Sequence, residues 1–340
     1  MISKSREQSL FVFGNGFDLA HGYHTKYCDF KKWLMATLNG NRLVEEVEDV
    51  LGQLRGGLPE FIDSFPNADD YYESDNWLWS NLENALSSIP DAYENMIEKA
   101  QVCFDDRKQE LYDHDPEMAD NVENDPAEQD SVRSTLDIPE LDKTINGLYS
   151  ELDEWIDSVD LRIRASSFTK TWSRPFQQGD KALTFNYTHT LEKIYEIPYS
   201  QILHIHGEAG NDNNPIILGH DVDLSSVVFD ESDESAAWGI VDGILGYSTS
   251  KTAKPTELII EQNECWFDSL KRVNNVLVYG HSLSEVDLPY FLRLMEATHS
   301  TSWCIYAHGS AKVPLCLLEK ARDEKIQLDE KDDKEFWNRS

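Results

Sequence analysis

The sequence predicts an α/β fold, with a Rossmann-like, mostly parallel sheet and a large helical insertion between its first and second strands. Short apolar runs bounded by turn residues alternate with helical segments, which is typical of strands buried on both faces of a parallel sheet. Between the first two runs, at residues 14–181, apolar side chains recur mainly at three- and four-residue spacing, which is typical of amphipathic helices.

Five apolar runs make up the predicted sheet, and each of them ends in a polar or glycine-containing loop. They lie at residues 10–13, 182–185, 202–205, 276–279 and 303–307. The longest helical stripe occupies residues 141–159, on an otherwise acidic segment. We therefore predict a single α/β domain over residues 1–340, with a helical lobe inserted at residues 24–180.

An acidic stretch inside that lobe, at residues 105–140, has the weakest pattern in the chain. It contains many aspartates and glutamates, few basic residues and no convincing apolar period. Such a composition favours a flexible, solvated segment, because it has little apolar surface to bury. The alternative is a docking segment for a basic partner.

Composition excludes several classes of protein. Lysine and arginine number 30 against 63 aspartates and glutamates, which gives a formal net charge of −33. A chain this acidic is unsuited to nucleic-acid backbones or to anionic membrane surfaces. Five scattered cysteines favour neither a disulfide framework nor a zinc site. With no signal-peptide pattern or long apolar run, the sequence predicts a soluble cytoplasmic protein.

Residues suited to chemistry follow four of the five predicted strands. In an open parallel sheet, ligands bind in the crevice outside the carboxyl ends of the strands. Four such groups therefore predict one ligand site. The groups are Gly14-Asn15-Gly16-Phe17-Asp18, Asn186-Tyr187, His206-Gly207 and Gly280-His281-Ser282.

The loop after the first strand carries part of a dinucleotide-binding pattern. Gly14 and Gly16 would let the backbone turn tightly and approach a pyrophosphate at a helix N-terminus. The third glycine of the full pattern is absent. A tight turn with Asp18 capping the next helix therefore accounts for the same residues.

Asn186 and His206 are the candidate catalytic residues of the second and third loops. The amide of Asn186 offers a donor and an acceptor, which suits ribose hydroxyls or a positioned water, and its alternative role is an Asx turn. His206 ends a strand before a glycine and is placed to act as a general base. His204 lies on the same face of that strand, but no third metal ligand stands at a suitable spacing, so we predict no metal site. The alternative to a functional role for these histidines is that of a buried core histidine bonded to the backbone.

In the loop after the fourth strand, Ser282 and Asp287 supply a hydroxyl and a carboxylate behind Gly280. Both groups are candidates for ligand contacts. Capping of the following helix is an equally good role for Asp287, since Pro289 is tolerated in a first turn.

Four segments resemble the signature blocks of the AbiH-type bacteriophage abortive infection family, in that family's order. They are FGNGFDLAHG at residues 13–22, LTFNYT at 183–188, HIHG at 204–207 and YGHSL at 279–283. The same blocks resemble, more distantly, the nucleotide-binding fold of sirtuins. There a glycine-rich loop holds the pyrophosphate of NAD, an asparagine and a histidine serve the nicotinamide ribose, and a Gly-x-Ser-Leu segment lines the adenosine side.

The resemblance to sirtuins implies roles for particular residues of this chain. Asn186 and His206 would serve the nicotinamide ribose, Gly14 and Gly16 the pyrophosphate, and Gly280 with Ser282 the adenosine side. The resemblance does not assign their loop neighbours Asn15, Phe17 and Asp287, but we add them to the predicted nucleotide-binding residues, which are Gly14, Asn15, Gly16, Phe17, Gly280, Ser282 and Asp287. The chain departs from sirtuins at Thr188, where they usually carry an acidic residue, and at Asn15, which replaces a small one. It also lacks the paired zinc cysteines, so we expect hydrolysis of NAD rather than protein deacylation.

We therefore expect an anti-phage abortive-infection effector that takes NAD or a related nucleotide as ligand or substrate and needs no other cofactor. Asn186 would orient the ribose or a water, His206 would remove a proton, and Asp18 would stabilise developing positive charge. A phage-derived trigger, a partner defence protein or a second copy of the chain are the partners left open. Two alternatives remain: a nuclease with carboxylates clustered around a metal ion, and a nucleotide-gated sensor without chemistry.

Overall fold

The computed structural model describes residues 8–37, 40–55, 77–80, 82–86, 89–112, 114–135, 138–163, 170–219, 254–300, 302–307 and 313–337. The chain divides into two compact units, each of which is described by itself. The first comprises Met1–Asp29, Asp153–Ile217 and Pro255–Ser340, and the second comprises Phe30–Leu152 and Leu218–Lys254. Their bounds differ from the single domain with a lobe at 24–180 that the sequence predicts.

The first unit contains a six-stranded sheet in the order β3-β2-β1-β4-β5-β6, and every neighbouring pair is parallel. The predicted α/β class with a Rossmann-like sheet is therefore confirmed. The strands are β1 (Gln8–Phe13), β2 (Lys181–Thr184), β3 (Ile202–His204), β4 (Val273–Tyr279), β5 (Ser302–Ala307) and β6 (Gln327–Asp332). Five coincide with the predicted runs. The sixth, QLDEKD, escapes the apolar pattern because it is a charged edge strand, the type that resists pairing with another chain.

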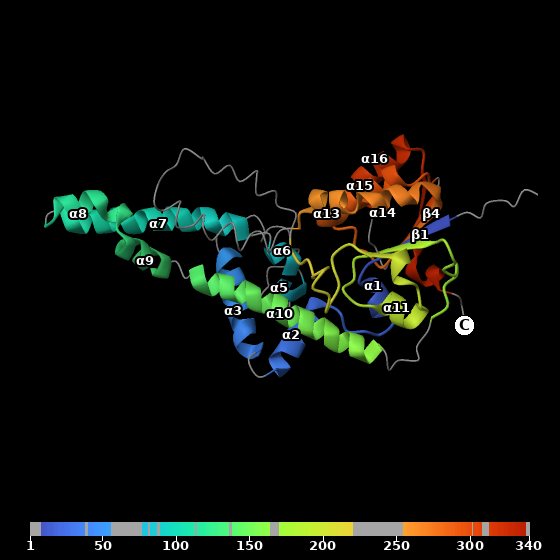
Figure 1. Cartoon of the computed structure of the whole chain (residues 1–340), viewed down its shortest axis with the longest axis horizontal. Coiled ribbons are helices and arrows are strands. Elements are labelled where there is room, and N and C mark those ends of the chain that lie inside the picture. The colour runs from blue at the N-terminus through green and yellow to red at the C-terminus, as the bar shows by residue number, and fades with distance from the viewer. Residues whose placement is uncertain are drawn as a thin grey trace, which may run out of the picture. The chain divides into compact units, whose positions relative to one another are not determined.

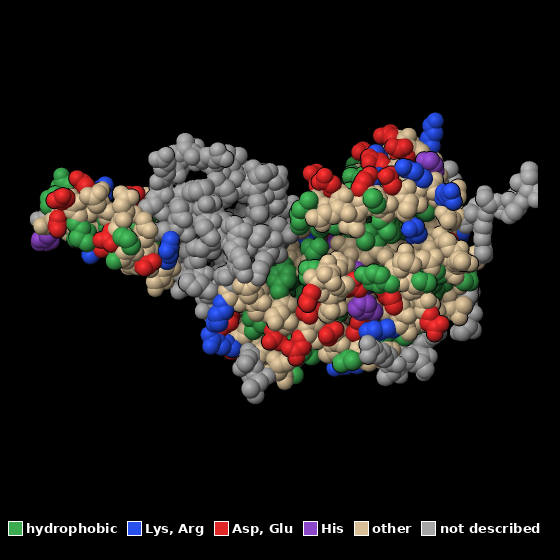
Figure 2. All heavy atoms as spheres, viewed as in Figure 1, with side chains coloured by type: hydrophobic (Ala, Val, Ile, Leu, Met, Phe, Trp, Pro, Cys, Tyr) green, Lys and Arg blue, Asp and Glu red, His purple; other side chains and the backbone are tan. Residues whose placement is uncertain are grey.

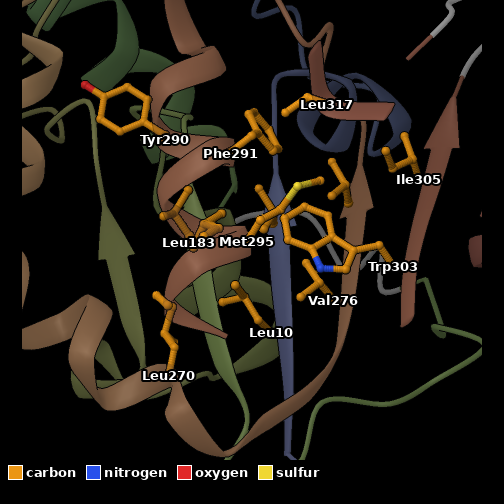
Figure 3. Packing of buried hydrophobic residues seen from close by; sticks show 14 of the residues in the cluster. Leu10, Leu183, Leu270, Val276, Tyr290, Phe291, Met295, Trp303, Ile305 and Leu317 are labelled. Atoms are coloured by element: carbon orange, nitrogen blue, oxygen red, sulfur yellow. The ribbon is translucent and has the colours of Figure 1, made fainter. Parts of the chain in front are cut away.

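Helices cover the two faces of this sheet unequally (Figure 1). One face packs against α13 (Thr256–Gln262), α14 (Glu264–Asp268), α15 (Leu288–Ala297) and α16 (Leu315–Asp323). Figure 3 shows this core, in which Phe291 and Met295 of α15 lie over Leu10, Val276 and Trp303 of the strands. This layer fixes the position of the loop that joins β4 to α15.

The opposite face is covered largely by aromatic side chains rather than by long helices. Phe11 and Phe13 of β1 pack against Trp172, with ring centroids 5.2 and 5.3 Å apart. The short helices α1 (Gly16–Ala20) and α11 (Thr190–Tyr195), together with the 3-10 turn at Asp333–Phe336, complete this layer. Because α1 and α11 follow β1 and β2 closely, they hold the residues just beyond those strands in place.

The second unit is helical in its described part. Its helices are α2 (Tyr27–Ala36, from Phe30 on), α3 (Gly40–Arg55), α5 (Trp77–Ser80), α6 (Leu82–Leu86), α7 (Ile89–Tyr112), α8 (Pro116–Asn121), α9 (Pro126–Thr135) and α10 (Ile138–Ile163, up to Leu152). Glu48 links three of them, since it pairs with Lys31 at 2.7 Å and accepts a hydrogen bond from the indole of Trp79.

The acidic stretch at 105–140 contains the end of α7, all of α8 and α9, and the start of α10. Ala119, Val122 and Val132 are buried within it, although the sequence shows no apolar period there. Each of the short helices buries only one side chain, which is too few to make a stripe. The flexibility expected of this stretch stays a prediction.

Acidic side chains are spread over the visible face of the described residues (Figure 2), in keeping with the net charge of −33. None of the helices in the described part of the chain combines the length and the apolar composition that crossing a bilayer requires.

Candidate functional site

The strand order places the candidate site at the centre of the sheet. From β1 the chain proceeds to β2 and β3 on one side, and β4, β5 and β6 lie on the other. This reversal is a topological switch point, where open α/β sheets bind ligands beyond their carboxyl ends. The loops after β1 and β4 meet there, because Gly14 N–H donates to Tyr279 O (3.0 Å) and Gly16 N–H donates to Gly280 O (2.8 Å).

Glycine is required where these two loops touch. A Cβ on Gly16 would lie 2.6 Å from the Cα of Gly280, and a Cβ on Gly14 would lie 2.7 Å from the Gly280 oxygen. Gly280 itself has φ +68°, which favours glycine. The contact between the loops therefore explains all three glycines, and the pyrophosphate contact that the sequence suggests stays a prediction.

Two other residues of the first loop have internal partners. Asn15 donates from Nδ2 to Thr25 O (2.9 Å) and accepts from the Thr25 hydroxyl at Oδ1, which fastens the following segment. The side chain of Phe17 is fully buried, with its ring centroid 4.4 Å from that of Phe13. The structure gives both residues a role in shaping the loop, and their predicted nucleotide contacts remain untested.

Asp18 and Asn186 lie near one another beyond β1 and β2. The carboxylate of Asp18 is 1% exposed and accepts hydrogen bonds from the hydroxyls of Thr188 and Thr190, each at 2.6 Å. The side chain of Asn186 lies near this carboxylate and also lowers its pKa slightly. Burial raises the pKa of Asp18 from 3.8 to about 6, although the two threonine hydroxyls and the side chain of Asn186 act in the opposite direction.

Asn186 has one buried polar atom without a hydrogen-bond partner. The residue is 7% exposed, and its side-chain oxygen Oδ1 receives no donor. Because a carboxylate can only accept, the amide nitrogen is the end that faces Asp18, and Oδ1 therefore points elsewhere. A buried acceptor without a donor is costly, which makes this oxygen a place where a ligand hydroxyl or a water would bind favourably.

His206 lies in a second group, together with Asp287 and His281. Its Nε2 is 3.3 Å from Asp287 Oδ1, while His281 Nε2 is 3.4 Å from Asp287 Oδ2. Both imidazoles pack against Phe185, with centroids 4.9 and 4.2 Å from its ring. Phe185 precedes Asn186 in the chain, so residues beyond β2 contribute to both groups.

The remaining predicted residues fall into two categories. Ser282 is exposed and lies in the loop after β4, where a ligand can reach its hydroxyl. His204 behaves as a core histidine, since its Nδ1 donates to Asn186 O (3.3 Å) and its Nε2 pairs with Glu192 (2.8 Å).

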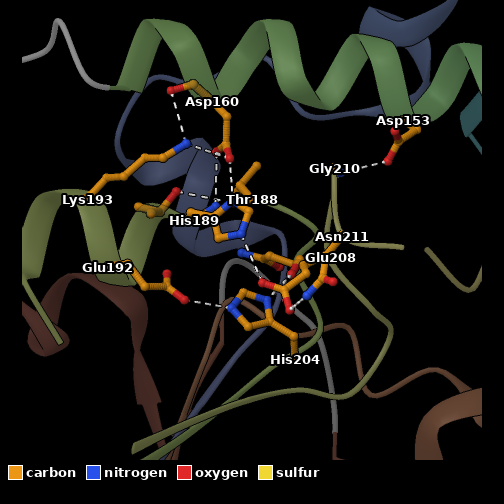
Figure 4. A network of polar contacts seen from close by, with 12 residues as sticks. Asp153, Asp160, Thr188, His189, Glu192, Lys193, His204, Glu208, Gly210 and Asn211 are labelled. Carbon is orange, nitrogen blue, oxygen red and sulfur yellow. Dashed lines mark hydrogen bonds and ion pairs between the residues drawn. The ribbon is translucent and has the colours of Figure 1, made fainter. Parts of the chain in front are cut away.

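Sequence reasoning missed a neighbouring polar network around His189 (Figure 4). The Nδ1 of His189 contacts Asp160, its Nε2 contacts Glu208 at 2.9 Å, and Lys193 pairs with Asp160 at 2.6 Å. Glu208 also accepts from the hydroxyl of Tyr199 (2.5 Å) and from Asn211 (2.8 Å).

The charges of this network support one another. The hydrogen bond to Asp160 raises the pKa of His189. Burial pushes the pKa of Asp160 upward, but hydrogen bonds from His189 and Lys193 outweigh burial and the net shift is downward. The pKa of Glu208 is also lowered on balance, because bonds from Tyr199 and others exceed the effect of its burial. The network is thus charged and internally satisfied.

A comparison with protein families identifies the chain. The family model described as bacteriophage abortive infection AbiH matches residues 10–307. The chain belongs to this family. The match extends from β1 to β5 and includes both groups of site residues, so the candidate site lies within the AbiH region. Membership indicates a protein of bacteriophage abortive infection defence. No curated protein matches the sequence.

In this AbiH chain, the residues missed from the sequence follow the same strands as those predicted. His189 comes three residues after Asn186, and Glu208 comes two after His206, so their position beyond β2 and β3 was the available signal. Among the described residues, no group of three or more histidines, cysteines, aspartates or glutamates is arranged to hold a metal ion. The expectation that no metal is required stays a prediction.

Proposed function

We propose that this AbiH protein binds NAD or a closely related nucleotide beyond β1, β2 and β4 and hydrolyses its nicotinamide–ribose bond. The observation that carries the proposal is the buried oxygen Oδ1 of Asn186, which has no donor. Ribose hydroxyls are donors of the kind this atom lacks. The neighbouring carboxylate of Asp18 disfavours an anionic group at that point and favours a positively charged one, such as the nicotinamide–ribose of NAD.

The proposed reaction uses water as the second substrate. Water attacks the anomeric carbon of the ribose, and the bond to nicotinamide breaks with its electron pair leaving on the ring nitrogen, which becomes neutral. His206 accepts a proton from the attacking water. The transition state resembles an oxocarbenium ion, so the ionised carboxylate of Asp18 stabilises it.

Chromatography of NAD, NADP and ATP after incubation with the purified chain, without added metal, tests this proposal. We expect nicotinamide and ADP-ribose to appear from NAD. The variant Asn186→Ala should lower turnover by roughly 10²-fold or more, because the ribose or water is no longer held in place. Asn274→Ala is the matched control, since Asn274 is an exposed residue of β4.

Two outcomes would contradict the proposal. One is a wild-type protein that neither binds nor cleaves any nucleotide, with or without its phage trigger. The other is undiminished NAD turnover by Asn186→Ala. Loss of DNA or RNA only in the presence of a metal ion would favour the nuclease alternative instead.

A further inference from the structure

Asp287 stands at the position of an N-cap, but its side chain does not cap. It precedes α15, whose second residue is Pro289, and it makes no side-chain hydrogen bond to the helix. The residue is 5% exposed, and its carboxylate faces the loop after β4 and His206, which follows β3. The side chain therefore does not take the capping role that the sequence suggests, and its predicted contact with a nucleotide stays untested.

Both oxygens of Asp287 have partners on neighbouring elements. Oδ2 accepts from the hydroxyl of Ser284 at 2.9 Å and lies 3.4 Å from Nε2 of His281. Oδ1 lies 3.3 Å from Nε2 of His206, an ion-pair distance without full hydrogen-bond alignment. Catalytic hydrogen bonds are often long before a substrate binds and tighten afterwards.

The tautomer of His281 follows from its other nitrogen. The backbone N–H of Leu283 donates to His281 Nδ1 at 2.8 Å, so that nitrogen carries the lone pair. The neutral ring then has its proton on Nε2, directed at Asp287. Leu283 adopts φ +56°, an uncommon conformation for a leucine, and its N–H is thereby directed at the His281 ring.

We propose that Asp287 is a positioning residue that holds His206 in the tautomer with its proton on Nε2 and its lone pair on Nδ1. The inference rests on the proposed function, because it assigns Nδ1 as the atom that takes the proton from water. An ionised carboxylate can only accept, so it favours N–H at the nitrogen it faces. Asp287 keeps its charge throughout and stabilises the imidazolium that forms.

Packing fixes the ring in the same orientation. The imidazole of His206 lies edge-on to Phe185, with centroids 4.9 Å apart, and 5.6 Å from the ring of Tyr290. A ring held by two aromatic side chains has little freedom to exchange its nitrogens by rotation. The carboxylate therefore decides which nitrogen is protonated, while the aromatic rings decide where that nitrogen points.

Nitrogen-15 NMR of histidine-labelled full-length protein tests the tautomer directly, because protonated and unprotonated ring nitrogens have well-separated shifts. The signals of His206 are assigned by their loss in His206→Gln. In the neutral wild-type ring, we expect Nε2 protonated and Nδ1 unprotonated. The opposite tautomer in the wild type would overturn the proposal, and this measurement needs no variant of Asp287.

Asp287→Asn then tests the cause. We expect the His206 signals to move toward the other tautomer or toward a mixture, whereas Asp268→Asn, the same change at an exposed surface pair with Lys271, leaves them in place. Unchanged His206 signals in a folded Asp287→Asn protein would overturn the proposal.

Turnover separates this inference from the proposed function. If the wild type cleaves NAD, Asp287→Asn should lower kcat by roughly 10²–10⁴-fold with a much smaller change in KM, since a base in the wrong tautomer affects chemistry more than binding. Equal losses in kcat and in nucleotide affinity would contradict a positioning role. If the wild type does not cleave NAD but the tautomer of His206 still depends on Asp287, the proposed function fails. The inference that Asp287 sets this tautomer is then still supported.

Discussion

Two polar groups beyond β2 and β3 differ in how completely their hydrogen-bonding atoms are matched. Around His189, the carboxylate of Asp160 pairs with His189 and Lys193, and that of Glu208 accepts hydrogen bonds from several donors. In the group around Asn186, the amide oxygen is buried without a donor. The first group is matched within the protein, whereas the amide oxygen of the second has no donor among the described residues.

The same contrast is visible in the carboxylates. The pKa of Asp160 is lowered on balance, so the fold stabilises its charge. Burial raises the pKa of Asp18 to about 6, so the fold opposes its charge. A buried carboxylate that the protein does not fully stabilise is typical of functional sites, where stability is given up for activity.

Alanine substitutions of His206 and of His189 should have opposite effects on turnover and on stability, and this contrast is the largest effect that we expect. His206→Ala should lower NAD turnover by roughly 10²–10⁴-fold, the usual contribution of a general base, in a protein that still folds. His189→Ala should leave turnover per folded molecule nearly unchanged. It should instead lower the free energy of unfolding by about 3–5 kcal/mol, because Asp160 and Glu208 remain buried without their shared partner.

Steady-state kinetics measures turnover, and urea denaturation measures the free energy of unfolding, for both variants. Undiminished turnover by His206→Ala would remove the catalytic assignment of that residue. A large loss of kcat in folded His189→Ala, without loss of stability, would reverse the roles of the two groups.

Neutralising the two aspartates should change stability with opposite signs at pH 7. Asp160→Asn should lower the free energy of unfolding by about 3 kcal/mol, since His189 and Lys193 lose a buried partner. Asp18→Asn should raise it by about 1–2 kcal/mol, because the cost of ionising a buried group with a raised pKa disappears. The same Asp18→Asn variant should lose turnover.

The pH dependence of unfolding sharpens this comparison. The raised pKa of Asp18 contributes stability below 3.8 that is lost as pH rises toward about 6, so the gain from Asp18→Asn should vanish in acid. The lowered pKa of Asp160 acts the other way: its contribution is present above 3.8 and is lost as pH falls further. The raised pKa of His189 contributes fully below 6.5 and less as pH rises above that value. A gain from Asp18→Asn that is as large at pH 3 as at pH 7 would contradict this account.

Much of the fold could be predicted because a buried parallel strand is apolar along its whole length. The strand β1 shows this from Leu10 to Phe13, and all four of these residues are fully buried in the structure. The edge strand β6 could not be predicted in that way, since half-exposed charged residues carry no apolar signal. The buried residues of α8 and α9 were hidden for a related reason, because one buried side chain per short helix sets no period.

The sequence could predict which residues belong to the candidate site better than it could predict which of them contact one another. Strand ends located Asn186 and His206, since all carboxyl ends of a parallel sheet meet at one edge. No local pattern could indicate that Asp18 accepts from Thr188, or that Asp287 faces His206, because these pairs are far apart in the chain. The contacts between the glycines of two loops were hidden for the same reason.

The smallest effect that we expect comes from Tyr199→Phe. This change removes the hydroxyl that donates to Glu208 at 2.5 Å but keeps the ring stacked on His204, with centroids 6.2 Å apart. Because Asn211 and His189 still donate to Glu208, the free energy of unfolding at pH 7 should fall by only about 0.5–1 kcal/mol, with NAD turnover unchanged. The loss should shrink in acid, where Glu208, whose pKa is lowered in the fold, takes up a proton. Urea denaturation against Tyr112→Phe, a change at an exposed tyrosine, measures it. A drop in turnover instead would mean that the network around His189 is part of the site, and the distinction between the two groups would fail.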